Sequence, residues 1–258
     1  MKAKPIALVV LLAVTVVGTV SAQGRFRNIT SIGFSYYSDQ RYGLDWEDVF
    51  IAPLPAGLYL ITAANGTNAS FSDITGGRLG LAFDLPGAFY GEGSYALEYD
   101  WREGGLLHSA FLSATYESGL ALASLSLTGE LTDTSAGGIA SPSLKYRMTP
   151  GLLLGATVFT AFHHYEPDAG YFNFAFLGTG EYALAPEILF SLGGTFSTVY
   201  EPTNQFEKWS VLGGITVTPA ETVTVKSQVE YTNAMLAQVN PHEIVSILLV
   251  VDIKFRGR

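Results

Sequence analysis

Apolar and polar side chains alternate with a period of two along most of this chain. In residues 223–231 the odd positions are Val, Val, Ser, Val and Tyr, whereas the even positions are Thr, Lys, Gln and Glu. The alternation returns in residues 89–101, 172–182, 188–200 and 247–255, mostly against a second face of polar or very small residues. Because successive side chains of a β-strand point to opposite faces, the pattern predicts an all-β protein whose strands have one apolar face.

The connections between these segments fall into two classes that alternate along the chain. The short class usually contains proline and comprises residues 53–57, 85–87, 117–119, 149–151, 185–187 and 218–220. The longer, more polar class comprises residues 39–43, 65–75, 102–105, 132–138, 165–170, 201–205 and 233–242. An up-and-down barrel has short turns at one rim and longer loops at the other, whereas a Greek-key sandwich requires crossovers.

Thirteen connections join 14 strands, so the sequence predicts a transmembrane up-and-down antiparallel β-barrel of 14 strands. Residues 45–52 alternate poorly, and if residues 39–75 form one loop the count is 12. Both counts are even, which places both chain ends at the same rim. The predicted strands are about 10–14 residues long, enough for the ~9–11 residues that a tilted strand needs to cross hydrocarbon.

The first 22 residues have the pattern of an export signal. Lys2 and Lys4 precede an apolar run over residues 6–20, and Val20-Ser21-Ala22 offers a small-residue cleavage site. This run is shorter than the ~20 residues of a membrane-spanning helix, which disfavours the alternative of an uncleaved anchor. We therefore expect a signal peptide over residues 1–22 and a single barrel domain over residues 23–258.

The composition narrows the class of protein further. Charged residues make up only 14% of the chain and mean hydropathy is +0.27, although no apolar stretch after residue 22 is long enough for a spanning helix. A hydrophobic protein without such helices is typical of a membrane barrel. The absence of cysteine excludes disulfides and thiolate metal sites. The net charge of −9 argues against nucleic acid as a partner.

Aromatic residues near the strand ends predict which face meets lipid. In a membrane barrel they form girdles at headgroup level, and the candidates are Tyr99, Trp101, Tyr116, Tyr182, Tyr200, Trp209 and Tyr231. The alternative is that they form the core of a soluble barrel. The last strand ends close to Phe255, which is similar to the terminal aromatic signature of outer-membrane barrels, except that Arg256-Gly257-Arg258 follow it.

The chain resembles bacterial outer-membrane β-barrels of the porin-like or small-channel type over residues 24–258, although no motif selects one subfamily. The resemblance implies a location in the outer membrane of a Gram-negative type envelope. The partners it implies are outer-membrane lipid, the barrel-assembly machinery during biogenesis, and small-molecule solutes.

The polar face predicts the lining of the barrel interior. Its charged members are candidate lumen-lining residues, namely Arg78, Asp84, Glu92, Glu98, Asp100, Glu130, Lys145, Arg147, Glu181, Lys208, Lys226, Glu230, Asp252 and Lys254. They are expected to attract and sort solutes in a water-filled lumen, to pair across neighbouring strands, or both. Eight strands enclose only side chains and 16–18 leave a channel, so a barrel of 12 to 14 lies between. Many small inward residues favour room inside: Gly80, Ala82, Ser124, Ser126, Gly155, Thr157, Ala175, Gly193, Ser197 and Gly214.

These features predict an outer-membrane channel for passive diffusion of small solutes, with a weak preference for cations or neutral solutes. The alternative is a structural or surface-interaction barrel with an occluded lumen, and a lipid-modifying enzyme is less favoured. His108 and Ser109 alternate to opposite faces, so they cannot act as a base and nucleophile, and we expect no catalytic residues and no cofactor. The weak metal candidates are His163, His164, Glu166 and Asp168, a combination more often found in a hydrated loop.

Overall fold

The computed structural model describes residues 25–38, 41–69, 73–85, 87–102, 104–165, 169–200, 205–236 and 239–256. The predicted signal peptide over residues 1–22 lies outside these ranges. The described chain contains a short 3₁₀ turn, η1 (Pro55–Gly57), and 14 strands. The strands are β1 (Arg25–Tyr37), β2 (Tyr42–Pro53), β3 (Leu58–Ala69), β4 (Asp73–Leu85), β5 (Phe89–Asp100), β6 (Leu106–Glu117), β7 (Ala121–Leu131), β8 (Ser135–Thr149), β9 (Leu152–Tyr165), β10 (Ala169–Ala185), β11 (Ile188–Tyr200), β12 (Gln205–Ala220), β13 (Val223–Leu236) and β14 (Val239–Arg256).

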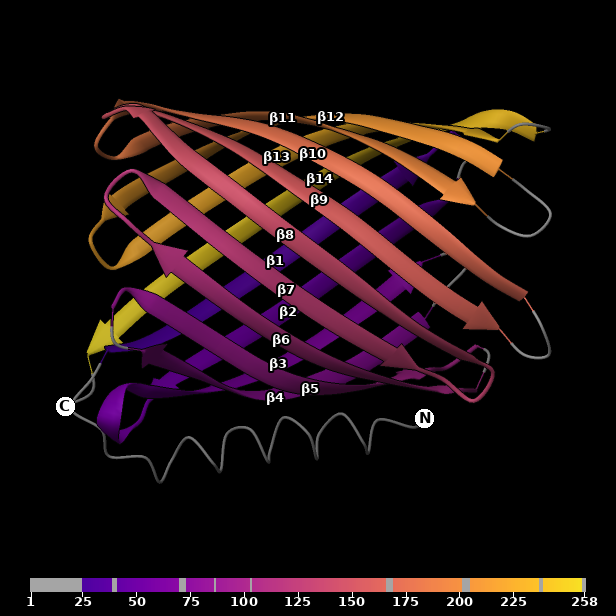
Figure 1. Cartoon of the computed structure of the whole chain (residues 1–258), viewed down its shortest axis with the longest axis horizontal. Helices are drawn as coiled ribbons and strands as arrows, with labels where there is room; N and C mark the ends of the chain where they lie inside the picture. The colour runs from indigo at the N-terminus through magenta and orange to yellow at the C-terminus, as the bar shows by residue number, and fades with distance from the viewer. Residues whose placement is uncertain are drawn as a thin grey trace.

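The strands form one closed barrel in which each strand pairs with its neighbours in sequence and β1 pairs antiparallel with β14. This confirms the prediction of a 14-strand up-and-down barrel. The alternative count of 12 is wrong, because residues 39–75 contain β2 and β3 and the start of β4. Figure 1 shows the strands inclined to the barrel axis, with β14 ending at the left-hand rim. With strands about 4.8 Å apart and tilted by about 40°, such a ring has a backbone radius of about 14 Å.

The connections at the right-hand rim of Figure 1 are shorter than predicted. The polar residues 65–69 belong to β3, and residues 233–236 and 239–242 belong to β13 and β14. Even the longest connection between strands covers only residues 101–105. The prediction ended these strands too early because polar and very small residues on both faces interrupt the apolar alternation there, while backbone pairing continues. We call this rim the long-loop rim and the opposite one the short-turn rim.

One turn at the short-turn rim was also predicted in the wrong place. Thr218-Pro219-Ala220 belongs to β12, and the chain reverses at residues 221–222. The register between β12 and β13 shifts between Val217 and Ala220, which is where Pro219 lies. A bulge tolerates proline inside a strand because no ladder hydrogen bond is required from its nitrogen.

The outer face of the barrel is predominantly apolar. Large exposed side chains such as Phe34, Leu79, Phe174 and Val229 belong to the alternation set that points away from the barrel axis. Phe89 and Tyr116 pack at the short-turn rim, and Tyr99 packs on Trp101 at the opposite rim. In the described part of the chain, no helix has the length and hydropathy needed to cross a bilayer.

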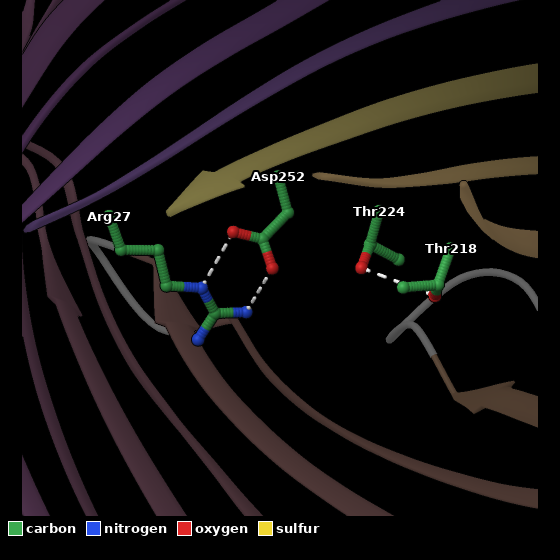
Figure 2. Close-up of polar contacts among 4 residues, drawn as sticks. All are labelled: Arg27, Thr218, Thr224 and Asp252. Atoms are coloured by element: carbon green, nitrogen blue, oxygen red, sulfur yellow. Dashed lines mark hydrogen bonds and ion pairs between the residues drawn. The ribbon is translucent and has the colours of Figure 1, made fainter. Parts of the chain in front are cut away.

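A two-pronged ion pair joins the first and last strands. Arg27 of β1 donates from Nε to Asp252 Oδ1 at 2.8 Å and from Nη2 to Oδ2 at 2.7 Å. Figure 2 shows this pair beside Thr218 and Thr224, whose hydroxyl oxygens lie 3.4 Å apart. The Asp252 side chain is only 11% exposed, whereas that of Arg27 is 43% exposed. The bidentate geometry fixes the register of the strand pair that closes the ring.

Replacing Arg27 with methionine is expected to destabilise the barrel by about 1–3 kcal/mol, because Asp252 loses both donors while largely shielded from water. Because Arg27 is partly exposed, the loss of stability is smaller than the loss expected on breaking a fully buried ion pair. Urea unfolding in lipid vesicles, followed by tryptophan fluorescence, measures the change. The double variant R27M/D252L should recover most of the loss. An R27M barrel with the wild-type unfolding midpoint would contradict this role.

Candidate functional site: the barrel interior

The register places the 14 candidate lumen-lining residues on the face opposite the apolar one. In the β4–β5 pair, Arg78, Asp84, Glu92 and Glu98 share one face, while Leu79, Leu81 and Leu97 occupy the other. The same holds for Lys208, Lys226 and Glu230 against Trp209, Val211 and Val229 in β12 and β13. In a closed barrel the face opposite the lipid-facing one is the interior.

Interior side chains meet across an intervening strand. Lys145 Nζ on β8 lies 2.8 Å from Glu181 Oε1 on β10, although β9 runs between them. Arg78 Nη2 on β4 likewise lies 3.1 Å from Glu47 Oε1 on β2, across β3. These contacts are possible because the concave wall turns side chains of alternate strands toward one another.

A glycine on the intervening strand makes room for the Lys145–Glu181 pair and for a further contact of the same kind, between Asn65 and Glu98. Gly155 of β9 pairs with Lys145 on one side and Thr179 on the other, and an added Cβ would lie 2.5 Å from Thr179 Oγ1. Gly76 of β4 lies under the hydrogen bond from Asn65 Nδ2 to Glu98 Oε1, and its Cβ would lie 2.5 Å from Glu98 Cγ. A side chain at either position would displace the polar pair above it.

Acidic residues concentrate on one side of the interior. We call the inward carboxylates of β2, β4 and β5 the acidic wall, and they are Asp45, Glu47, Asp84, Glu92, Glu98 and Asp100. Arg78 is the inward basic residue among these strands. Neutral donors also hold the carboxylates, since Thr67 Oγ1 donates to Asp45 at 2.7 Å and Tyr59 OH donates to Asp84 at 3.0 Å.

An apolar cluster fills part of the interior beside the acidic wall, on the inner face of β1 to β4. Val49, Ile61 and Ala82 are buried, and Ile29, Ile51, Tyr59 and Ala63 pack around them. All seven point inward from β1 to β4, with the Arg78–Glu47 pair near them. This side of the barrel is therefore packed by its own side chains.

Small hydroxyl side chains recur on the opposite side of the interior, between larger inward residues such as Phe159, Leu177 and Leu212. We call the inward Ser and Thr residues of β7 to β12 the hydroxyl wall, and they are Ser124, Ser126, Thr128, Ser135, Ser141, Ser143, Thr157, Thr179, Ser191, Thr195, Ser197, Ser210, Thr216 and Thr218. Thr157 donates to Ser143 at 3.0 Å, so some of these hydroxyls hydrogen-bond laterally along the wall. In the ring order, β10 and β11 lie half a circumference from β3 and β4, so the two walls face each other.

Of the 14 sequence-derived candidates, the structure brings Lys145 and Glu181 together. Others bond to residues that the sequence did not single out, such as Asp252 with Arg27 and Arg78 with Glu47. Within the described ranges, Glu92, Glu130, Arg147, Lys208, Lys226 and Lys254 make no side-chain hydrogen bond or ion pair. Arg27, Asp45, Glu47 and Asn65 were missed because they lie in segments where the apolar alternation is weak.

The histidines of the β9–β10 hairpin do not converge on one face. The register places His163 inward, opposite Gly137, while the adjacent His164 points outward. No group of three or more metal-ligating side chains occurs among the residues described, and Glu166 and Asp168 lie outside them. His108 points outward and its Nδ1 is hydrogen-bonded to Tyr95 OH, on the face opposite Ser109.

Comparison with solved structures identifies the fold. The CymD monoaromatic hydrocarbon channel superimposes with a TM-score of 0.69 at 8% identity, over 97% of this chain and 93% of that one. A bacterial polysaccharide outer membrane secretin gives 0.59 at 11% identity, over 90% and 98%. An anion-selective porin from Comamonas acidovorans gives 0.52 at 8% identity, over 90% and 99%. No protein-family profile and no curated sequence matches. The chain thus has the fold of bacterial outer-membrane β-barrels, a group that includes porins and channels.

A valine at Gly155 is expected to destabilise the barrel by about 1–3 kcal/mol, because its side chain would occupy the space over which Lys145 reaches Glu181. The matched control is Ala156→Val, one residue along β9 on the outer face, where the added methyl groups meet lipid. Urea midpoints in vesicles compare the two variants. Equal urea midpoints for the two variants would show that the close approach at Gly155 contributes nothing to the stability of the barrel.

Proposed function

We propose that this barrel is a passive channel for small polar solutes, with a weak preference for cations or neutral solutes. The observation that carries the proposal is the asymmetric interior, in which an acidic, partly packed side faces a wall of small hydroxyl residues. In a ring of about 14 Å radius, the short side chains of the hydroxyl wall leave more space than the packed side of β1 to β4, although larger residues such as Phe159 and Leu212 also point inward there. The passage therefore runs along the hydroxyl wall.

The short connections support an open lumen. The bounds of the described strands leave at most five residues between consecutive strands, as at residues 101–105, which is little chain with which to cover the lumen. The same shortness argues against a surface-interaction barrel, since such loops offer little area to a protein partner.

The chemistry of the two walls indicates the class of solute. Hydroxyl groups both donate and accept hydrogen bonds, so they can replace water around uncharged polar solutes without selecting a sign of charge. The acidic wall adds a negative potential that favours cations, and its ion pair with Arg78 moderates this effect. The proposed selectivity is consequently weak.

A bulky residue on the hydroxyl wall is expected to obstruct the passage. Ser126→Trp should lower single-channel conductance in a planar bilayer about twofold or more, because an indole projects into the lumen. Leu125→Trp, on the same strand but facing lipid, should leave conductance unchanged. Absence of conductance from the folded wild-type barrel, or equal conductance of both variants, would contradict the proposal.

Neutralising the acidic wall is expected to reduce the preference for cations. In a KCl gradient, Glu92→Gln combined with Glu98→Gln should shift the reversal potential toward the chloride value, because two negative charges leave the lumen. Lys226→Met on β13 removes a positive charge and should shift it the opposite way. A reversal potential unmoved by either change would mean that permeating ions do not pass these residues.

A further inference from the structure

A group of polar side chains lies on the outer face of β1 and β2. Asp48 of β2 pairs in register with Thr30 of β1, and both share a face with Phe50 and Ile32. Asp48 Oδ1 accepts hydrogen bonds from Thr30 Oγ1 at 2.7 Å and from Asn28 Nδ2 at 2.9 Å. We call Asn28, Thr30 and Asp48 the outer polar cluster.

The depth of this cluster places it in hydrocarbon rather than at the headgroups. Asp48 lies near the middle of β2, between the outward-facing rings of Trp46 and Phe50. A tilted strand advances about 2.5 Å per residue along the barrel axis, which puts Asp48 about 12 Å or more from either end of β2. The apolar band of such barrels is about 25 Å tall, so the carboxylate lies near its centre.

Lipid cannot satisfy a polar group at this depth. Acyl chains offer no hydrogen-bond donor, and in the described residues Asp48 Oδ2 has no donor within the chain. A carboxylate facing the membrane centre is therefore costly unless another protein surface covers it.

We propose that the outer face of β1 and β2 is the contact surface between two copies of this chain, related by a two-fold axis along the membrane normal. Such an axis passing between the two strands places β1 of one copy opposite β2 of the other. Within each copy Thr30 and one hydrogen of the Asn28 amide already bond to Asp48, and the second amide hydrogen makes only a long contact of 3.4 Å with Val49 O. In the dimer this second hydrogen faces Oδ2 of the partner's Asp48 at a similar depth, and the symmetry forms the same contact in reverse.

Aromatic residues beside the cluster supply apolar contact area. Phe26, Phe50 and Phe255 form a ring cluster on the same face, with centroids 5.8 to 6.1 Å apart. Stacked rings lose little conformational freedom on contact, which makes them suitable anchors around a polar centre. A dimer at this surface would leave the interior untouched, so the inference does not depend on the proposed channel function.

The first test is the oligomeric state of the refolded barrel by sedimentation equilibrium in density-matched detergent. The wild type should be a dimer, and the variant N28L/T30V/D48L should raise the dimer dissociation constant by at least about tenfold, since hydrogen bonds to a charged group are lost. The control S227V/T160V makes polar-to-apolar changes on the outer face of β13 and β9, and it should leave the dimer dissociation constant unchanged. A monomeric or trimeric wild type, or an equally dimeric cluster variant, overturns the proposal.

Cross-linking provides a second test that keeps the cluster intact. Because the chain contains no cysteine, Ile32→Cys on β1 gives a single thiol in an outward position next to Thr30. Packed sheets lie about 10 Å apart, within reach of a flexible bis-maleimide, so two copies should be joined in lipid vesicles. Phe174→Cys, exposed on β10 at the far side of the barrel, should yield only monomer. Equal cross-linking at both positions, or none at Cys-substituted position 32, overturns the proposal.

Discussion

The closure of β1 on β14 is the constraint on which the rest of this structure depends. In hydrocarbon, every strand edge would expose amide and carbonyl groups with no water to satisfy them, at several kcal/mol for each group. The chain avoids this cost by pairing all 13 residues of β1 with β14. The bidentate contact of Arg27 with Asp252 lies at this seam, where it also selects the register.

Closure also determines how interior side chains interact. In a flat sheet, side chains two strands apart are separated by nearly 10 Å, beyond the reach of most hydrogen-bonded pairs. Curvature shortens that distance on the concave side, so Lys145 meets Glu181 and Arg78 meets Glu47 across an intervening strand. Charge neutralisation inside the barrel therefore follows from its closed shape as much as from the residues present.

The sequence predicted the strand number and the faces of β4 to β14 well, since each strand there separates apolar from polar positions. It also found the charged inward residues of these strands, because their outward neighbours are clearly apolar. It assigned no faces in β1 to β3, where residues 45–52 alternate poorly because they carry Asp48 outward and Val49 and Ile51 inward. Partners two strands apart, such as Asn65 and Glu98, could not be predicted because their contact needs barrel curvature and the absence of a side chain at Gly76.

The failure of the alternation in β1 to β3 has a physical meaning. In these strands the inner face is packed with Val49 and Ile61 against Ala82 of β4, as in a soluble core, while the outer face carries Asn28, Thr30 and Asp48. A wall built this way is stable in a membrane only if its outer polar groups face something other than acyl chains. The packed inner face would hold such a surface rigid, because side chains beneath the strands resist their bending. Apolar residues inside and polar residues outside weaken the alternation of these strands in the sequence. The same arrangement identifies the sector of the barrel best suited to contact another protein.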